Sequence, residues 1–535
     1  MSDDADTEPL GKAARRRAAG GPADLSLPTI LIDPGQLPRA VDETLSALRD
    51  DPGLFQRGGV IVRPCIEAVP AAGGGATTSL RIVPITTPHI RESATRVANY
   101  MKFDARVGDR VRCNCPSEVA EAVCARPNPG LKPIAGVITA PLMRLDGSLL
   151  DEPGYDAATA LLFEPCGATF PSVSRNATRE DATAALKFLK APLRSFPFIG
   201  LPDLAVALSG VITAVNRRAL PTAPLHAFTS PGPGSGKSYL VDWISTIATG
   251  FAAAVITQSR SDEETDKRIA AALIAGDALI SLDNCEHALG GGALCVAISQ
   301  PTSKNRMLGL SLNIETPNNA AFFATANNLL LGADMPRRSL VGTMDPQQER
   351  PELRQFEDDP VKIARRERGR YIAATLTILR AFHNAGRPEI APPIGSFAEW
   401  SLLVRNALLW LGEADPCETM EKAREADEQL KQLVAVMDAW EAVPTLSDRR
   451  KSVNELIAVA SEEDLNPAGG ILYRHAGFRE ALLAVAGGDG GNINARRLGK
   501  WLAKNERRVC RGRRIVRDGG RAGFVFWKLE LVEAP

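Results

Sequence analysis

The stretch Pro231-Gly-Pro-Gly-Ser-Gly-Lys-Ser238 decides the fold of this 535-residue chain. Its end matches the template G-x-x-x-x-G-K-[ST], whereas Pro231 occupies the first glycine position of that template. Glycines permit positive φ, so such a loop can turn its backbone N–H groups inward around phosphate oxygens. A helix that begins near Lys237 would add N-terminal donors and a positive dipole. The stretch therefore predicts a phosphate-binding loop, with an ordinary glycine-rich turn between a strand and a helix as the alternative.

Each polar residue of this loop has an expected task. Lys237 should reach the β- and γ-phosphates of a nucleotide, and Ser238 should be a ligand of Mg²⁺. ATP and Mg²⁺ are therefore the expected cofactors. The residues expected to surround the nucleotide are Gly232, Pro233, Gly234, Ser235, Gly236, Lys237 and Ser238.

A second apolar strand is predicted at Ala278-Leu-Ile-Ser-Leu-Asp283, and it ends in a carboxylate. At the carboxyl edge of a parallel sheet, Asp283 would lie beside Mg²⁺ and serve as its second protein ligand. An ordinary buried strand that happens to end in Asp is the alternative. Glu286 is the next carboxylate along the chain. It either polarises the attacking water or is a surface residue, and the sequence favours neither.

A third strand is predicted at Ala320-Ala-Phe-Phe-Ala-Thr-Ala326, followed by Asn327-Asn328. An amide at that point can orient the attacking water, although Asn is also a common turn residue. Pro336-Arg337-Arg338 follows shortly afterwards. An arginine there could reach the γ-phosphate bound by a neighbouring subunit, and a solvated surface pair is the alternative.

Alternation of strands and helices from residue 225 to about 350 predicts a parallel sheet with helices on both faces. The other segments have different patterns. The expected organisation is a polar tail at 1–25, an α+β domain of unknown role at 26–200, the α/β P-loop core at 201–350, a helical region at 351–445 and a basic module at 450–535. In the α+β domain we expect helices at 38–50, 90–101 and 116–125, and strands at 60–63, 80–84 and 136–139.

The four motifs in this order resemble those of the superfamily 3 helicases, specifically the helicase part of phage and plasmid primase–helicases, within the P-loop AAA+ ATPases. The resemblance covers roughly residues 200–350. Its most specific stretch is Asn305-Arg-Met-Leu-Gly-Leu-Ser-Leu-Asn-Ile-Glu-Thr-Pro317, which leads into Phe323-Ala-Thr-Ala-Asn-Asn328. Three residues depart from the family pattern, namely Pro231, Asn284 and Ala326, and they put the hydrolysis rate in doubt more than nucleotide binding.

The resemblance implies an ATP-driven DNA helicase or translocase that works as a ring, with ATP between subunits. It makes Asn327 the sensor and Arg338, or else Arg337, the arginine finger. It also implies that Lys304 and Arg306 lie on a hairpin that grips the DNA backbone, where two solvated charges are the alternative. The catalytic residues expected together are Lys237, Asp283, Glu286, Asn327 and Arg338.

The C-terminal segment 491–535 has twelve Lys and Arg against four Asp and Glu. Residues 492–505 predict an amphipathic helix, with Leu498, Trp501 and Leu502 on one stripe. A strand at 509–516, a turn at Asp518-Gly-Gly520 and a strand at 524–529 would complete a winged-helix-like module. The candidate DNA contacts are Arg496, Arg497, Lys500, Lys504, Arg513 and Arg514. A basic face on a protein-interaction module is the alternative.

Composition sets wider bounds on function. The chain has 63 basic and 63 acidic side chains, so any DNA-binding surface must come from local clustering. Because the sequence has neither a membrane-length apolar run nor a signal peptide, we expect a cytoplasmic protein. Two alternatives to a helicase remain: a non-motor ATPase that loads or positions replication proteins, and a DNA-binding module whose ATPase has decayed.

Overall fold

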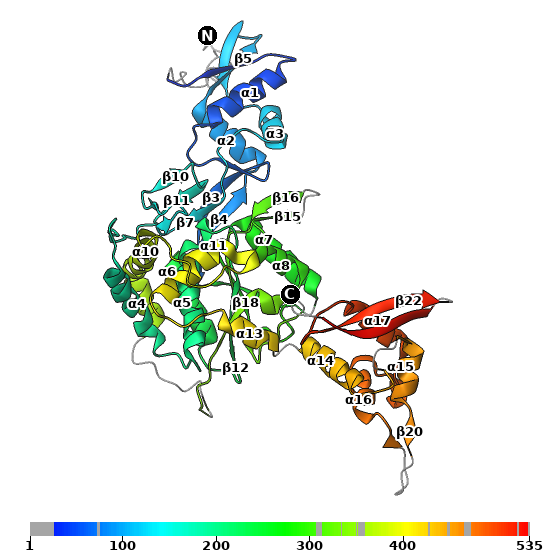
Figure 1. Cartoon of the computed structure of the whole chain (residues 1–535). Helices are drawn as coiled ribbons and strands as arrows, with labels where there is room; N and C mark the ends of the chain where they lie inside the picture. Colours follow the sequence, from blue (N-terminus) through cyan, green and yellow to red (C-terminus); the bar gives the residue numbers. More distant parts are fainter. Residues whose placement is uncertain are drawn as a thin grey trace, which may run out of the picture. The chain divides into compact units, whose positions relative to one another are not determined.

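The structure is a computed structural model that describes residues 26–532, apart from 72–74, 260, 307–312, 333, 349, 351–358, 426–427, 447–449, 465–471 and 522–523. The expected N-terminal tail, residues 1–25, lies outside this range. The chain forms two compact units, Met1–Met420 and Glu421–Pro535, which are treated separately below (Figure 1). Among the described residues, no helix has the length and apolar character needed to cross a membrane.

The first part of unit 1 combines short sheets with three helices. Its elements are β1 (Thr29–Ile32), α1 (Leu37–Leu48), β2 (Phe55–Arg57), β3 (Val60–Ala71), β4 (Gly75–Pro84), α2 (Thr87–Val97), β5 (Asn99–Asp104), β6 (Asp109–Cys113) and α3 (Ser117–Ala125). The strands form two sheets, ordered β1-β5-β6 and β2-β3-β4. Short strands and one helix lead on to the core: β7 (Gly136–Ile138), β8 (Leu142–Met143), β9 (Leu149–Leu150), β10 (Gly154–Asp156), β11 (Leu161–Phe163) and α4 (Arg179–Leu193).

A five-stranded parallel sheet forms the centre of unit 1, as the alternating pattern predicts. Its order is β13-β14-β17-β12-β18. The elements of this core are α5 (Leu201–Asn216), β12 (Leu225–Ser230), α6 (Lys237–Thr249), β13 (Ala254–Thr257), α7 (Asp262–Ala275), β14 (Leu279–Asp283), α8 (Gly292–Ser299), β15 (Thr302–Arg306), β16 (Asn313–Pro317), β17 (Ala321–Asn327) and β18 (Ser339–Thr343). The loop at 231–236 therefore follows a central strand.

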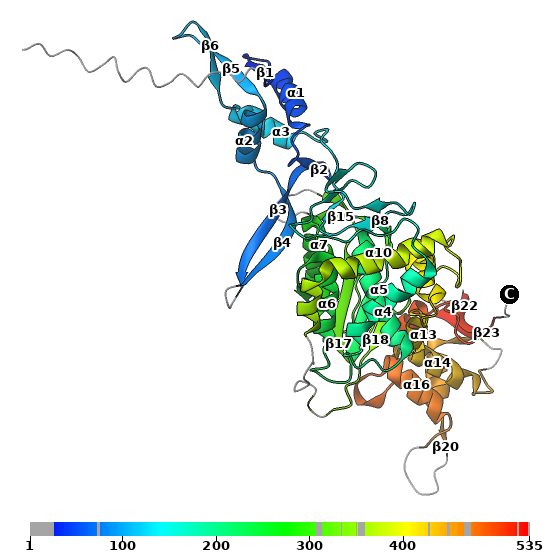
Figure 2. The ribbon, with the colours of Figure 1, turned by 90° about the vertical axis from the view of Figure 1, so that its left-hand side faces the viewer.

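Helices cover both faces of this sheet. Successive side chains of a strand point to opposite faces, and in β17 both faces carry apolar side chains. In β17, Phe323 packs with α5 and α6, whereas Phe322 and Ala324 pack with α7 and α8. Both sides are buried, which explains the nearly continuous apolar strands. Figure 2 shows α6 and α5 beside β17 and β18.

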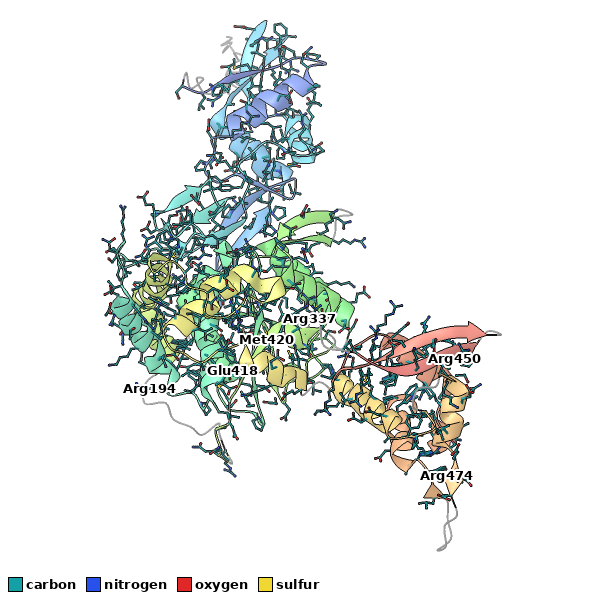
Figure 3. All side chains as sticks on the ribbon, in the orientation of Figure 1. Arg194, Arg337, Glu418, Met420, Arg450 and Arg474 are labelled. Carbon is teal, nitrogen blue, oxygen red and sulfur yellow. The ribbon has the colours of Figure 1, made fainter. Side chains whose placement is uncertain are left out.

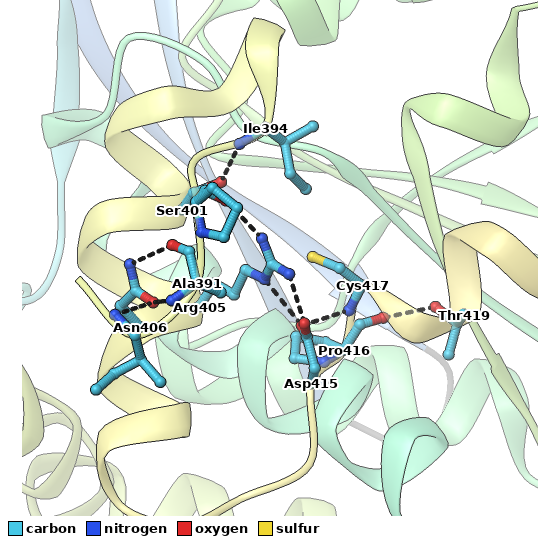
Figure 4. Close-up of polar contacts among 11 residues, drawn as sticks. Ala391, Ile394, Ser401, Arg405, Asn406, Asp415, Pro416, Cys417 and Thr419 are labelled. Atoms are coloured by element: carbon cyan, nitrogen blue, oxygen red, sulfur yellow. Dashed lines mark hydrogen bonds and ion pairs between the residues drawn. The ribbon is translucent and has the colours of Figure 1, made fainter. Parts of the chain in front are cut away.

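The rest of unit 1 is helical, with α9 (Pro360–Arg366), α10 (Arg368–Asn384), α11 (Ala398–Trp400), α12 (Asn406–Trp410) and the first residues of α13 (Glu418–Glu425), which continues into unit 2. The Arg405 guanidinium joins two loops of this region (Figure 4). Its Nε donates to Asp415 at 2.9 Å and its Nη1 donates to the Pro392 carbonyl at 2.9 Å. Burial raises the pKa of Asp415, but the bonds from Arg405 outweigh burial and hold that pKa below its usual value. This ion pair therefore fixes the segment that leads to α13.

Unit 2 has its own core, which includes Trp440, Phe478 and Trp527. Its elements are α14 (Glu428–Glu441), β19 (Lys451–Ser452), α15 (Val453–Ala460), β20 (Glu463–Asp464), β21 (Leu472–Tyr473), α16 (Ala476–Ala486), α17 (Ala495–Lys504), β22 (Arg513–Arg521) and β23 (Phe524–Leu531). Helix α14 packs into this core, so the unit begins before the predicted boundary at 445–450.

The structure differs from the sequence prediction in four local elements, one of which is the strand expected at 509–516, observed as β22 from Arg513 to Arg521. The helix expected at 90–101 ends at Val97, because Asn99–Met101 pair with β1. The helix expected at 492–505 begins at Ala495, where the Asn494 side chain caps it by accepting the Arg497 N–H. The turn expected at Asp518–Gly520 is a register irregularity within β22, and pairing with β23 resumes at Gly520.

Candidate functional site

The glycine-rich loop joins β12 to α6, and its conformation explains why Pro231 is tolerated. Positive φ occurs at Gly234 (78°) and Gly236 (91°), the latter immediately before the first residue of α6. No positive φ is found at Pro231 or Gly232, so the first template position needs no glycine here. The predicted start of the helix at Lys237 is confirmed.

Lys237 lies among oxygen atoms at the carboxyl end of the sheet. Its Nζ donates to Ser230 Oγ at 2.5 Å, Ser235 Oγ at 3.0 Å and Asn327 Oδ1 at 2.8 Å. The residue is only 8% exposed. Burial lowers the pKa of Lys237, and the attraction of Asp283 opposes that effect. The partners at hydrogen-bond distance are neutral, so the ammonium is positioned to meet an anion.

The two expected magnesium ligands are in direct contact. Ser238 Oγ donates to Asp283 Oδ1 at 2.7 Å. Thr325 Oγ1 donates to the same carboxylate oxygen at 2.5 Å, and its own oxygen accepts the Asn284 N–H at 3.0 Å. The Asp283 carboxylate is thus oriented from β17 as well as from α6. A hydroxyl and a carboxylate are the hard oxygen ligands that Mg²⁺ prefers.

Asn284 follows this carboxylate and has a φ of 50°. This left-handed conformation is one that Asn tolerates better than most residues. The backbone at this turn therefore accounts for an amide in the place of a second acid. Glu286, the next carboxylate, is exposed, and its position does not separate the two roles considered for it.

Asn327 and Asn328 close the opposite side of the loop. The Asn327 side chain joins Lys237 to the end of β17, where a sensor of nucleotide state is expected. Asn328 has a φ of 51°, and its Nδ2 donates to the Pro231 carbonyl at 3.2 Å. The expected residues Lys237, Ser238, Asp283 and Asn327 are therefore brought together by helix α6 and the two strands β14 and β17.

Arg337 and Arg338 lie outside this cluster and share one carboxylate. The Arg338 Nη2 donates to Asp334 Oδ2 at 2.7 Å, and the Arg337 Nη2 donates to the same atom at 2.5 Å. The Arg337 side chain is 54% exposed, whereas the Arg338 side chain is 14% exposed. Figure 3 labels Arg337 among the side chains of the chain. The Arg338 Nη1 is buried and has no partner among the described residues. The bond from Arg337 lowers the pKa of Asp334, so the carboxylate stays charged.

Lys304 and Arg306 are exposed residues of β15, which pairs with β16 in an antiparallel hairpin. Lys304 lies opposite Glu315 and Arg306 lies opposite Asn313. Both basic side chains occupy one face of the strand. The remainder of the specific stretch, residues 307–312, lies outside the described residues.

The basic residues predicted for the C-terminal segment fall into two groups. Arg496, Arg497, Lys500 and Lys504 are exposed on α17. Arg513 is only 7% exposed, and its Nη1 donates to Glu441 at 2.6 Å while its Nη2 binds Asp438. Arg514 pairs with Glu530 at 2.9 Å. The structure thus corrects the assignment of Arg513, whose guanidinium is engaged by α14 and cannot face DNA.

Sequence reasoning missed Ser230, Thr325 and Asp334. Ser230 is the last residue of β12, and Thr325 lies two positions before Asn327, so each strand places a hydroxyl at its carboxyl end. Side chains alternate along a strand, so Thr325 lies on the same face as Asn327, and this spacing was the signal that could have identified it. No comparable signal pointed to Asp334, because its role depends on the turn that follows β17.

A buried arginine holds the far end of α6. The Arg368 Nε donates to the Ile247 carbonyl at 3.0 Å, and its Nη2 donates to the Ala248 carbonyl at 2.9 Å. The same guanidinium binds the carbonyl and hydroxyl oxygens of Thr139. Burial lowers the pKa of Arg368 to about 10, so it remains charged near neutral pH. A cation at a helix C-terminus complements the helix dipole.

Comparisons with known proteins give limited information. No protein-family model and no curated protein matches the chain. A solved structure of the NrS-1 C-terminal region (residues 305–718) has a TM-score of 0.32 and 13% identity, over 76% of this chain and 81% of that chain. A second NrS-1 structure gives 0.28 and 15%, over 52% of this chain and 59% of that chain, less than two-thirds of its length. JCV helicase gives 0.20 and 11%, over 48% and 71%. Scores this low carry no functional argument, which must come from the site.

Proposed function

We propose that this protein is an ATP-dependent DNA helicase or translocase that acts in the replication of a phage or integrated mobile element. The proposal rests on one observation, the convergence of Lys237, Ser238, Asp283 and Asn327 around the loop that precedes α6. Such a group of residues suits a nucleoside triphosphate and Mg²⁺.

The individual tasks follow from chemistry. The left-handed conformations of Gly234 and Gly236 allow backbone N–H groups to turn toward the inside of the loop, and Lys237 would neutralise the β- and γ-phosphates. Ser238 and Asp283 would hold Mg²⁺, which supplies charge neutralisation on the phosphate oxygens. Asn327 would orient the attacking water, with Glu286 as the candidate that polarises it. Arg338 of one subunit would complete the site of another in a ring.

The DNA part of the proposal is supported by exposed basic residues in two places. Lys304 and Arg306 lie on one face of the β15–β16 hairpin, and α17 exposes four basic side chains in unit 2. Helix, strand and strand in the order α17-β22-β23 support a winged-helix-like module for duplex DNA. Phosphate contacts of this kind would position the chain without reading sequence.

The alternative functions make different predictions for two assays. ATP hydrolysis stimulated by single-stranded DNA is expected for a motor, and its absence would favour a DNA-binding module with a decayed ATPase. Displacement of a strand from a forked duplex is expected for a helicase. DNA-stimulated hydrolysis without displacement or translocation would favour a non-motor ATPase that loads or positions replication proteins.

We expect Lys500→Ala and Arg513→Ala to act in different ways. Lys500 is exposed on α17, so its loss should weaken DNA binding of all sequences and reduce the salt slope by about one. Loss of Arg513 removes the shared partner of Asp438 and Glu441, whose side chains are 47% and 55% exposed, and should lower the free energy of unfolding of unit 2 by up to about 1 kcal/mol. Fluorescence anisotropy across salt concentrations and thermal melting would measure the two effects. Unchanged DNA binding by Lys500→Ala would count against α17 as a contact surface.

A further inference from the structure

The sheet β1-β5-β6 has one buried face. Ile30 of β1 pairs with Tyr100 of β5, and the two side chains are 1% and 0% exposed. Both belong to a core completed by α1, α2 and α3, for example by Ile90 and Val119. Helices therefore fill one side of this small sheet (Figure 2).

The opposite face carries an exposed aromatic ring. Because side chains alternate along a strand, Leu31, Met101 and Phe103 point away from that core. Phe103 is 61% exposed, and none of these three side chains belongs to a hydrophobic core of the described residues. In β6, Arg110 pairs with Phe103 and Arg112 pairs with Met101. We call these five residues the aromatic face.

Positive charge accompanies the ring. The β5–β6 hairpin, 99–113, has four basic and two acidic side chains in a chain that is neutral overall. Asp33 accepts from both Arg110, at 2.8 Å, and Arg39, at 3.0 Å, and Arg39 also pairs with Glu43 at 3.8 Å. The bonds from these arginines hold the pKa of Asp33 below its usual value. Together with Arg39, Asp33 and Glu43, the hairpin has five basic and four acidic side chains, so a small positive surplus remains beside Phe103.

We propose that the aromatic face binds single-stranded nucleic acid, with a base stacked on Phe103 and neighbouring phosphates beside Arg110 and Arg112. A sheet that exposes an aromatic ring between cationic side chains matches the chemistry of an unpaired strand, whose bases stack and whose backbone is anionic. A protein partner would also cover the ring, but it would not require the surplus of positive charge. This role is separate from the nucleotide site and gives the N-terminal part of unit 1 a task.

The test compares full-length variants with labelled oligothymidylate and oligouridylate, which distinguish DNA from RNA, in the absence of nucleotide. Phe103→Ala should weaken binding about 5- to 100-fold, the range that stacking of one base carries, and Phe103→Tyr should retain it. Val107→Ala is the matched control, because Val107 is 63% exposed at the turn of the same hairpin. A strand that contains 5-iodouracil should crosslink to Phe103 on irradiation, as peptide mapping would show.

Wild-type affinity in Phe103→Ala together with no crosslink within β5 would overturn the proposal. That result is also expected if a protein partner or residues 1–25 of this chain occupy the aromatic face. An equal loss of affinity in Val107→Ala would also overturn the proposal, because the effect of Phe103→Ala would then not be specific to the aromatic ring. Lys237→Ala should bind these strands normally without nucleotide, so failure of the nucleotide site and failure of the aromatic face are distinguishable.

Discussion

We expect Lys237→Ala to lower the rate of the proposed ATP hydrolysis by at least about 10²–10³-fold, the effect of removing a donor that stabilises developing negative charge. The cause is local, because the lysine ammonium is held by Ser230, Ser235 and Asn327 in the loop. The chain should still fold, since burial already lowers the pKa of Lys237 and its removal takes away a buried cation. Phosphate release and thermal melting would measure the two properties.

A matched control is Lys267→Ala, which removes an exposed lysine of α7 that is paired with Glu263. Hydrolysis should be unchanged in this variant. Full activity in Lys237→Ala would exclude the loop as the hydrolytic site. Removal of Mg²⁺ by a chelator should abolish hydrolysis in the wild type, because Ser238 and Asp283 are expected to act through the metal.

Arg338→Ala should lower turnover by about 10³–10⁵-fold, the range found for arginine fingers, and should leave ATP binding intact. The Arg338 side chain is mostly buried against Asp334, with one guanidinium nitrogen unpaired among the described residues. Arg337 binds the same carboxylate from the exposed side, so Arg337→Ala is the matched control. We expect it to retain turnover within a few-fold. A large loss in Arg337→Ala alone would transfer the role to that residue.

Mixing variants tests whether the arginine acts between subunits. Lys237→Ala retains Arg338, and Arg338→Ala retains the loop, so neither should hydrolyse ATP alone. In a mixed ring, some sites combine an intact loop with an intact arginine, and part of the activity should return. Failure of the mixture to recover activity would contradict an arginine supplied in trans. The same assay therefore reports on the ring and on the finger.

Sequence reasoning predicted the strands of the core and the start of α6 because apolar runs and glycines mark them directly. It also placed Asp283 and Asn327 together, since parallel strands carry their last residues to one edge. The positions that it missed depend on packing between distant segments. Arg513 looked like one basic residue among many, and only the fold of unit 2 brings α14 against it.

The bulge in β22 was likewise invisible, because Asp-Gly-Gly is an equally good turn signal. Because β22 pairs with β23 again at Gly520, the segment is a bulge within the strand and not a turn. The end of α2 has a similar origin, since residues 99–101 have partners in β1 that lie about 70 positions away in the chain. Long-range pairing overrides a local helical pattern in that case.

The bonds from Arg368 to the end of α6 have a mechanical consequence. A helix anchored at its carbonyl end by a buried guanidinium cannot slide without breaking several hydrogen bonds at once. If the chain works as the proposed motor, the loop in front of α6 would be its stationary part. Nucleotide-dependent displacement should instead arise in the exposed β15–β16 hairpin, where Lys304 and Arg306 would move the bound DNA strand.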